Sequence, residues 1–310
     1  MRRPAAALLA LLGATVVAGC GLGAGPAPTA IELAVTRDFG ASAIPHTGSL
    51  AVSGQETAMS LLMRNYTVNT RFGGGFVQSV DGVSGGQEAG RPVDWFYYVN
   101  GVEASKGAAA TNVHPGDHIW WDHHDWSQTD HVPAVVGSFP EPFLNGIDGK
   151  RLPVRIECSA VSGYACGTVA ERLRALLIPA AIAGVGIGGA AQTLRLLVGP
   201  WVQVAGDLDA RSIAAGPSTS GVYSRFSPDG RTLTLLDQDG RAVRTLSAGA
   251  GLVAATSRAE DAPVWVVTGT DETGMNLAAR AFTQSALHDH FAVAVTAGET
   301  VALPVAVAKP

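Results

Sequence analysis

Alternation of apolar and polar positions predicts a series of short strands in the first third of the chain. Residues 31–36 alternate with a period close to two, which is typical of a half-buried strand. Later segments flank three consecutive glycines or are rich in aromatic and β-branched residues, which favour a pleated surface. The expected strands are Ile31–Thr36, Val68–Phe72, Phe76–Val80, Trp95–Val99 and His118–Trp126.

Turn and cap residues separate these strands. Asn100-Gly101 ends one aromatic strand, and Pro115-Gly116-Asp117 precedes the other. Both are turn signals, because asparagine and glycine tolerate positive φ and proline presets a turn. Thr57 can cap a helix through its hydroxyl, and that helix is expected to end near Asn65.

The second half of the chain shows a different pattern. A stretch with several prolines and glycines at 128–150 predicts an extended linker. Thr168 and Glu171 form a capping box that predicts a helix start, and Asp271 can cap a later helix. Two Asp-Gly turns join three strands into a β-meander, and a continuous apolar strand is typical of the centre of a sheet. The expected strands include Val154–Cys158, Val222–Phe226, Thr232–Leu236, Ala242–Leu246 and Val264–Val267.

One stretch, from Asp94 to Trp126, resembles a known family. The family pattern is an aromatic strand ending in Val-Asn-Gly, a spacer, and then Gly-Asp followed by a strand with tryptophan. The matching positions are Trp95, Tyr97, Tyr98, Val99, Asn100, Gly101, Gly116, Asp117, Ile119 and Trp121. This is similar to the transcobalamin-like C-terminal domains, and the resemblance implies a small β-grasp fold.

Together these patterns predict an α+β protein. A β-grasp domain is expected at 30–127, a linker at 128–150, and a mixed α/β domain with the β-meander at 151–310. A length of 310 residues fits about two domains.

The N-terminus predicts export and a membrane anchor. Residues 1–19 combine two arginines with a short apolar segment, the pattern of a secretory signal peptide. The segment ends Val-Ala-Gly-Cys, which resembles the lipobox of bacterial lipoproteins, and the resemblance implies acylation of Cys20. Residues 20–29 are rich in Gly, Ala and Pro and are expected to form a flexible tether to the lipid bilayer. The alternative is an ordinary signal peptide with an incidental cysteine.

The composition limits which classes of binding partner are expected. The formal net charge is −5 and the few lysines and arginines form no cluster, so nucleic-acid binding is not expected. If Cys20 is acylated, Cys158 and Cys166 remain. Outside the cytoplasm two nearby cysteines can form a disulfide, and two buried free thiols are the alternative.

Aromatic side chains are the main candidates for ligand binding. Only one face of a β-grasp sheet packs on its helix, so some rings must lie on the other face or at an edge. The rings either form core and inter-domain contacts or line a ligand site in the cleft between the domains. The candidates are Trp95, Tyr97, Tyr98, Asn100, Trp120 and Trp121. The family resemblance makes a cobalamin-like corrinoid an implied ligand.

Histidines and aspartates on the last aromatic strand are candidates for metal binding. His118, Asp122 and His124 share one strand face, and imidazole with carboxylate suits divalent transition metals. Their spacing matches no established metal motif, so a polar strand with aromatic neighbours is the alternative interpretation.

No catalytic motif is found, so an enzyme is not expected, although folding can assemble a site that sequence does not reveal. The expected function is an extracytoplasmic, membrane-anchored binding lipoprotein that carries a small molecule to a membrane transporter. The alternative is a structural or adhesion lipoprotein whose aromatic face binds a protein or a cell-wall polymer. An enclosed aromatic cleft would favour the first, and a flat exposed patch the second.

Overall fold

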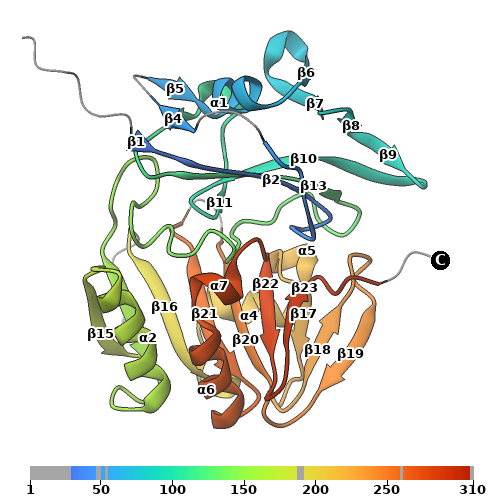
Figure 1. Cartoon of the computed structure of the whole chain (residues 1–310). Coiled ribbons are helices and arrows are strands. Elements are labelled where there is room, and N and C mark those ends of the chain that lie inside the picture. Colours follow the sequence, from blue (N-terminus) through green and yellow to red (C-terminus); the bar gives the residue numbers. More distant parts are fainter. Residues whose placement is uncertain (1–28, 47–49, 53–54, 187–191, 259–260, 308–310) are drawn as a thin grey trace, which may run out of the picture.

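The computed structural model describes residues 29–46, 50–52, 55–186, 192–258 and 261–307. These form a mixed α/β structure with many strands in several sheets and few helices. Figure 1 shows two layered parts: an N-terminal part at the top of the view and a C-terminal part below it, joined by residues 128–150. The expected signal peptide, Cys20 and most of the expected tether lie outside the described residues.

The N-terminal part is organised around one sheet. Its strand order is β11-β10-β13-β2-β3, and β9 pairs with the first residues of β10. The bounds are β2 (Glu32–Arg37), β3 (Ser42–Ala43), β9 (Gly86–Glu88), β10 (Arg91–Val99), β11 (Val102–Glu103) and β13 (His118–Asp125). β13 is central, antiparallel to β10 and parallel to β2.

One helix and several short strands cover one face of this sheet. Helix α1 (Ala58–Asn65) is capped by the Thr57 hydroxyl, which accepts from Ser60 N, so the expected cap and helix end are confirmed. Its apolar face packs with Leu33, Ile119 and Trp121 of the sheet. The other elements are β1 (Thr29–Ala30), β4 (Ala51–Val52), β5 (Glu56–Thr57), β6 (Val68–Arg71), η1 (Phe72–Gly74), β7 (Phe76–Val80), β8 (Val83–Ser84), η2 (Ala108–Ala110) and β12 (Asn112–Val113).

The C-terminal part contains a sheet of seven strands. The order is β15-β14-β16-β21-β20-β22-β23, in which the first four are parallel and the last three join antiparallel. The bounds are β14 (Val154–Cys158), β15 (Ala180–Gly184), β16 (Leu194–Pro200), β20 (Gly251–Thr256), β21 (Val264–Gly269), β22 (Ala292–Val295) and β23 (Thr300–Leu303). All six residues of β21 are buried, which confirms the expected central strand.

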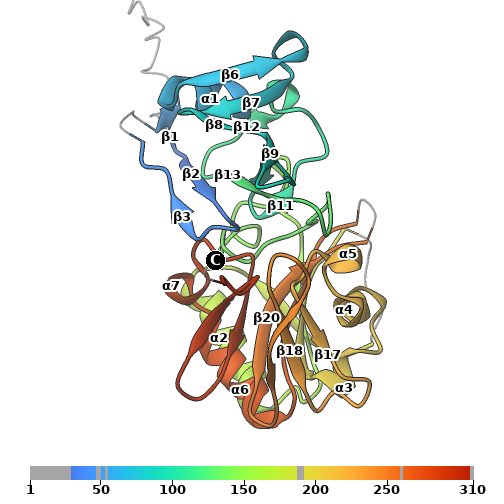
Figure 2. The same ribbon diagram turned by 90° about the vertical axis from the view of Figure 1, so that its right-hand side faces the viewer.

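Different elements cover the two faces of this sheet, as Figure 2 shows. One face packs on α2 (Tyr164–Ala175), α6 (Glu272–Ala281) and α7 (Gln284–Leu287). The other packs on the expected meander, observed as β17 (Ser224–Phe226), β18 (Leu233–Leu236) and β19 (Ala242–Leu246), and on short helices. These short helices are α3 (Trp201–Val204), α4 (Leu208–Ser212), η3 (Ile213–Ala215) and α5 (Pro217–Ser220).

The connection at 128–150 is more than an extended linker. Val135 and Val136 are fully buried, and Phe139 and Phe143 pack on Trp265 of β21. Hydrogen bonds tie this segment to both parts, since Val135 N donates to Gly101 O and Val136 N donates to Phe291 O. Its regular secondary structure is sparse, as expected, but its side chains belong to the core. No helix in the described ranges has the length and apolar character needed to span a bilayer.

Candidate functional site

The aromatic strand β13 lies at the contact between the two parts. All eight of its residues are buried, because one face meets α1 and the other meets the C-terminal part. Trp120 packs against Phe291, which precedes β22, with ring centroids 5.2 Å apart. Tyr98 packs against the same ring at 5.5 Å. These two rings therefore belong to a core that spans both parts.

The six residues expected to bind a ligand are divided between the two faces of the sheet. Tyr98 and Trp120 face the C-terminal part, whereas Trp95 and Trp121 join the core under α1. Tyr97 is half-buried on that same side and stacks on Trp121 at 4.6 Å. The five other than Tyr97 are buried. The arrangement is that of packed cores rather than a shared ligand cleft.

Asn100 has a structural role: it bonds segments that are distant in the sequence. It adopts a φ of 54° at the expected turn, and its amide nitrogen donates to Asp117 Oδ1 and Gly146 O, each at 2.8 Å. Its carbonyl oxygen accepts from His118 N at 2.8 Å. The side chain is fully buried and joins the hairpin to the connecting segment.

Asp122 and His124 form a buried hydrogen-bonded pair. His124 Nδ1 lies 2.8 Å from Asp122 Oδ1, and the imidazole is stacked between Phe39 and Phe96, each at 4.5 Å. Asp122 also accepts from the backbone of Phe39 and Gly40 at 3.0 and 2.9 Å. The carboxylate therefore holds the loop after β2 against the sheet, and few of its lone pairs remain for an ion.

His118 is separate from that pair. Residues four apart on a strand are roughly 13 Å apart, so His118 cannot share an ion with Asp122 and His124. Both its ring nitrogens are buried without a hydrogen-bond partner. Burial lowers the pKa of His118 to about 4; Glu32 opposes the shift and His288 adds to it. Among the described residues, no three His, Cys, Asp or Glu side chains are placed to hold a metal.

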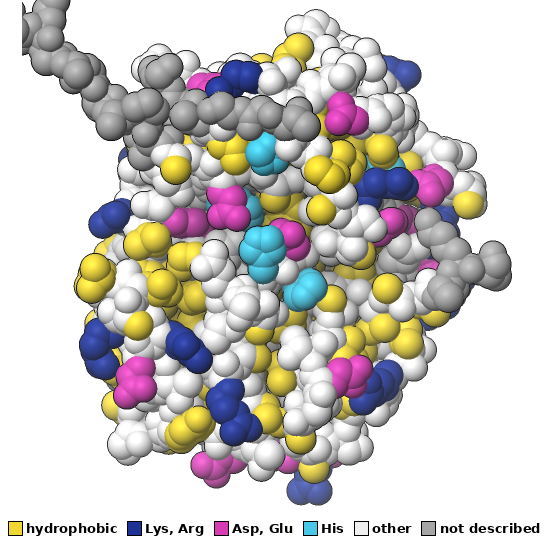
Figure 3. All heavy atoms as spheres, in the orientation of Figure 1, with side chains coloured by type: hydrophobic (Ala, Val, Ile, Leu, Met, Phe, Trp, Pro, Cys, Tyr) yellow, Lys and Arg dark blue, Asp and Glu magenta, His cyan; other side chains and the backbone are white. Residues whose placement is uncertain are grey.

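Acidic and histidine side chains surround this position at the boundary between the two parts, where Figure 3 shows them on the surface. His288 Nε2 lies 3.7 Å from Glu32 Oε1, and His288 Nδ1 lies 3.1 Å from Asp289 Oδ2. Glu32 is paired with His118 in the sheet. The cluster therefore links the N-terminal sheet to the segment before β22.

A cavity lies elsewhere, at the carboxyl ends of the parallel strands of the C-terminal part. Its volume is about 160 Å³. It is lined by Ser159 and Ala160 after β14, by Pro200 at the end of β16, by Gln203 of α3, and by the first turns of α2 and α6. This edge of the sheet is the one distant from the N-terminal part (Figure 1).

The cavity is at the topological switch point of the sheet. The chain leaves β14 through α2, on one face, to reach β15 at the edge of the sheet, whereas it leaves β16 toward α3 and α4 on the other face. Open α/β sheets bind ligands in the crevice that this divergence creates. The two strand ends approach closely here, since a Cβ at Gly199 would lie 2.8 Å from the Ser159 Oγ.

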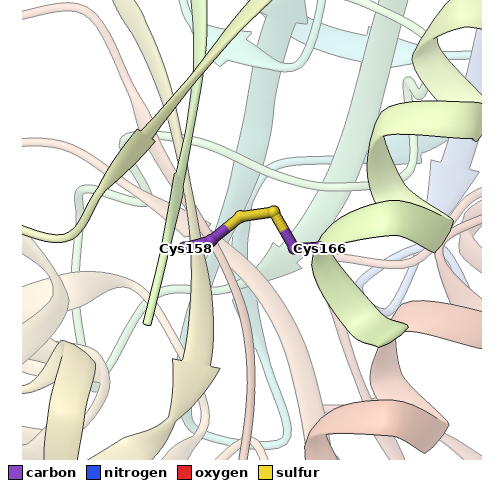
Figure 4. The surroundings of a disulfide bond; sticks show 2 residues. All are labelled: Cys158 and Cys166. Atoms are coloured by element: carbon purple, nitrogen blue, oxygen red, sulfur yellow. A yellow bond between two sulfur atoms is a disulfide. The ribbon is translucent and has the colours of Figure 1, made fainter. Parts of the chain in front are cut away.

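Helix α2 begins earlier than the capping box at Thr168 and Glu171 predicted. Its first residue is Tyr164 and its N-cap is Gly163, which has no side chain to cap the helix. The reason is tertiary: Cys166 in the first turn is joined by a disulfide to Cys158 at the end of β14, with Cα atoms 5.9 Å apart (Figure 4). The uncapped amides of this turn border the cavity, with a partial positive charge.

Both hydrogen-bond donors and a hydrogen-bond acceptor therefore line the cavity. The α2 amides are hydrogen-bond donors, whereas the Glu272 carboxylate at the start of α6 is an acceptor. Asp271 caps α6 by accepting from Gly274 N, which confirms its expected role. Tyr164 and Met275 add apolar surface.

A buried ion network lies close to this edge, on the other face of the sheet. Glu157 is fully buried and its Oε1 lies 2.9 Å from Arg195 Nε. Hydrogen bonds from Arg195 to Glu157 and to Asp207, the N-cap of α4, raise the pKa of the guanidinium. The network fastens α4 to the sheet behind the switch point.

The sequence did not reveal this cavity because its lining residues form no recognisable motif. Serine, alanine, glycine and proline carry no motif, and the one carboxylate comes from a distant helix. The signal that could have found it is the strand order, since carboxyl ends at a switch point are where such sheets bind ligands.

A corrinoid does not fit the cavity at the switch point. The cavity is smaller than the roughly 300–1,000 Å³ of sites for drug-sized ligands, and a corrinoid is larger still. His118, the histidine considered for cobalt, lies buried beside Trp120 with ring centroids 6.3 Å apart.

Comparison with known proteins adds one family. No curated protein matches the chain. Residues 55–125, under a quarter of the chain, match the model of a family described only as a domain of unknown function (DUF4430).

Proposed function

We propose that the chain is a membrane-anchored extracytoplasmic lipoprotein that binds a small polar molecule in the cavity at the switch point. The observation that carries the proposal is the position of this cavity, at the edge where α/β sheets bind ligands. The signal sequence and Cys20 support an extracytoplasmic, membrane-anchored location, and the buried disulfide agrees with an oxidising compartment.

The cavity chemistry narrows the ligand class. A ligand with an acceptor group can bind the α2 amides, and a donor group can face Glu272. A small molecule that carries one acceptor group and one donor group matches the volume of the cavity. Delivery to a membrane transporter follows from the carrier role.

For the N-terminal part we propose a β-grasp domain of the transcobalamin-like kind. The first long strand β2 lies parallel beside the last strand β13, and a single helix packs on one face. Its role in this proposal is structural, because its open face is covered by the C-terminal part.

Ligand binding is tested with the mature chain carrying Cys20→Ser, purified from its native host. Mass spectrometry of the denatured protein identifies any small molecule released, and calorimetry then measures its affinity. Ala160→Phe, an exposed position at the cavity, should fill the space and weaken binding at least tenfold. Ala109→Phe, at an exposed alanine of the N-terminal part, is the matched control.

The outcomes separate the alternatives. Equal affinity in both variants would place the ligand outside the cavity. Retention of a protein or a cell-wall polymer in place of a small molecule would favour the adhesion alternative. Turnover of the bound molecule would contradict a non-catalytic carrier. The anchor is tested independently by fatty-acid labelling of the full chain, which Cys20→Ser should abolish.

A further inference from the structure

The β6–β7 hairpin carries an exposed pair of aromatic rings. Phe72 at its tip is 86% exposed and Phe76 is 36% exposed. The two rings contact each other edge to face, with centroids 6.2 Å apart. A phenylalanine so fully exposed gains nothing from the fold of this chain, because its apolar surface stays in water.

The backbone holds Phe72 in this exposed position. Its φ is 52°, in the left-handed region that bulky side chains rarely adopt, and Gly73 and Gly74 follow with φ of 71° and 93°. The strands behind the tip are paired in an antiparallel ladder. The hairpin therefore presents the ring on a supported turn rather than on a loose loop.

The expected anchor lies at the same end of the molecule. Figures 1 and 2 place β1 and the β6–β7 hairpin in the N-terminal part, away from the edge that carries the cavity. Only eight residues separate Cys20 from Thr29, the first residue of β1. Even fully extended they reach only about 30 Å. An acylated Cys20 would keep this end of the molecule close to the bilayer.

The charge of the hairpin suits an anionic lipid surface. Residues 68–80 contain one charged side chain, the exposed Arg71 beside Phe72, and no Asp or Glu. An aromatic ring next to an arginine is the combination that binds the headgroup and upper acyl region of a membrane. A single arginine near such a surface adds attraction without requiring a specific protein partner.

From these observations we infer that the β6–β7 hairpin inserts Phe72 and Phe76 into the membrane interface, as a second contact beside the lipid anchor. This inference rests on the proposed lipoprotein. The second contact fixes the orientation of the N-terminal part against the bilayer.

Insertion can be measured by depth-dependent quenching of a tryptophan at the tip. The mature chain starting at Cys20 is coupled through that thiol to a maleimide phospholipid, in vesicles of phosphatidylcholine and phosphatidylglycerol. The remaining cysteines form the disulfide. In Phe72→Trp, replacing the lipids by brominated ones should reduce the added emission. In Leu177→Trp, at an 89% exposed position of the C-terminal part, it should not.

A second measurement uses the unanchored chain with Cys20→Ser. Its partitioning onto the same vesicles should fall about tenfold in Phe72→Ser, since burying a phenylalanine is worth about 1.5 kcal/mol or more. Leu177→Ser should leave partitioning unchanged.

Two results would overturn the inference. One is equal quenching of the two tryptophans. The other is a concentration-dependent emission shift of Phe72→Trp without vesicles, which would assign the hairpin to contact with a second copy of the chain. Failure of fatty-acid labelling would instead reject the natural anchor, and the chemical coupling keeps the hairpin test independent of it.

Discussion

Asn100 illustrates how one residue can join separate segments. Its left-handed backbone makes the turn after β10, and its amide group bonds Asp117, His118 and Gly146. Because all of these groups are buried or partly buried, removing the amide leaves them unpaired away from water.

We therefore expect Asn100→Ala to reduce the free energy of unfolding by roughly 2–4 kcal/mol. Urea unfolding followed by tryptophan fluorescence measures the change. Asn112→Ala, at an exposed position of β12, should change stability by less than about 0.5 kcal/mol. Similar values for the two variants would show that the buried bonds of Asn100 contribute little.

His118 makes stability depend on pH. Its pKa in the folded protein is about 4, below the ordinary value of 6.5, because burial disfavours the imidazolium. The unfolded chain therefore binds the proton more readily, so this contribution to stability is complete above pH 6.5 and is lost as the pH falls toward 4.

In His118→Phe, which keeps a ring of similar size, the fall in stability across that window should become shallower. Urea unfolding at a series of pH values measures the slope for both proteins. An unchanged slope would assign the acid sensitivity to other groups.

Glu141 acts in the opposite sense, since burial raises its pKa to about 7. Its contribution to stability is therefore lost as the pH rises from the ordinary 4.5 through 7.

At the scale of the element, the disulfide fastens the first turn of α2 to the end of β14. The sulfur atoms come from residues separated by eight positions, and both cysteines are buried. This connection explains why α2 begins at Tyr164 without a side-chain cap, since the cross-link holds a turn that lacks one.

Loss of the disulfide should lower the free energy of unfolding by about 2.5 kcal/mol, the chain-entropy value for a loop of this length. Guanidinium unfolding measures the free energy of unfolding of the oxidised protein and of the double variant Cys158→Ser, Cys166→Ser. A reductant should destabilise the former and leave the latter unaffected. A reductant effect of equal size on both would mean that it acts elsewhere.

At the scale of the whole molecule, the two parts share one core. Phe39, Tyr98 and Trp120 from the N-terminal part pack in the same cluster as Tyr223 and Phe291 from the C-terminal part. Unfolding one part exposes the apolar surface of the other, so the two should unfold together.

We expect the unmodified protein to unfold in a single cooperative transition. Phe291→Ala should cost about 3–5 kcal/mol and separate the transitions of the two parts. Phe282→Ala removes the same ring from the core beneath α6, within the C-terminal part, and should destabilise the protein while the single transition remains. Calorimetry together with near-ultraviolet circular dichroism distinguishes these outcomes.

Local chemistry along the sequence determined the strands, the turns and two helix caps. Alternation set the strand faces around β13, Asn-Gly and Asp-Gly placed the hairpins, and Thr57 and Asp271 began their helices, because each depends on a few neighbouring residues. The tertiary structure alone decided what those faces meet. It covered Trp120 with Phe291 and moved the start of α2 through the disulfide. It also made the cavity, because the divergence of β14 and β16 depends on strand order, which brings together residues distant in the chain.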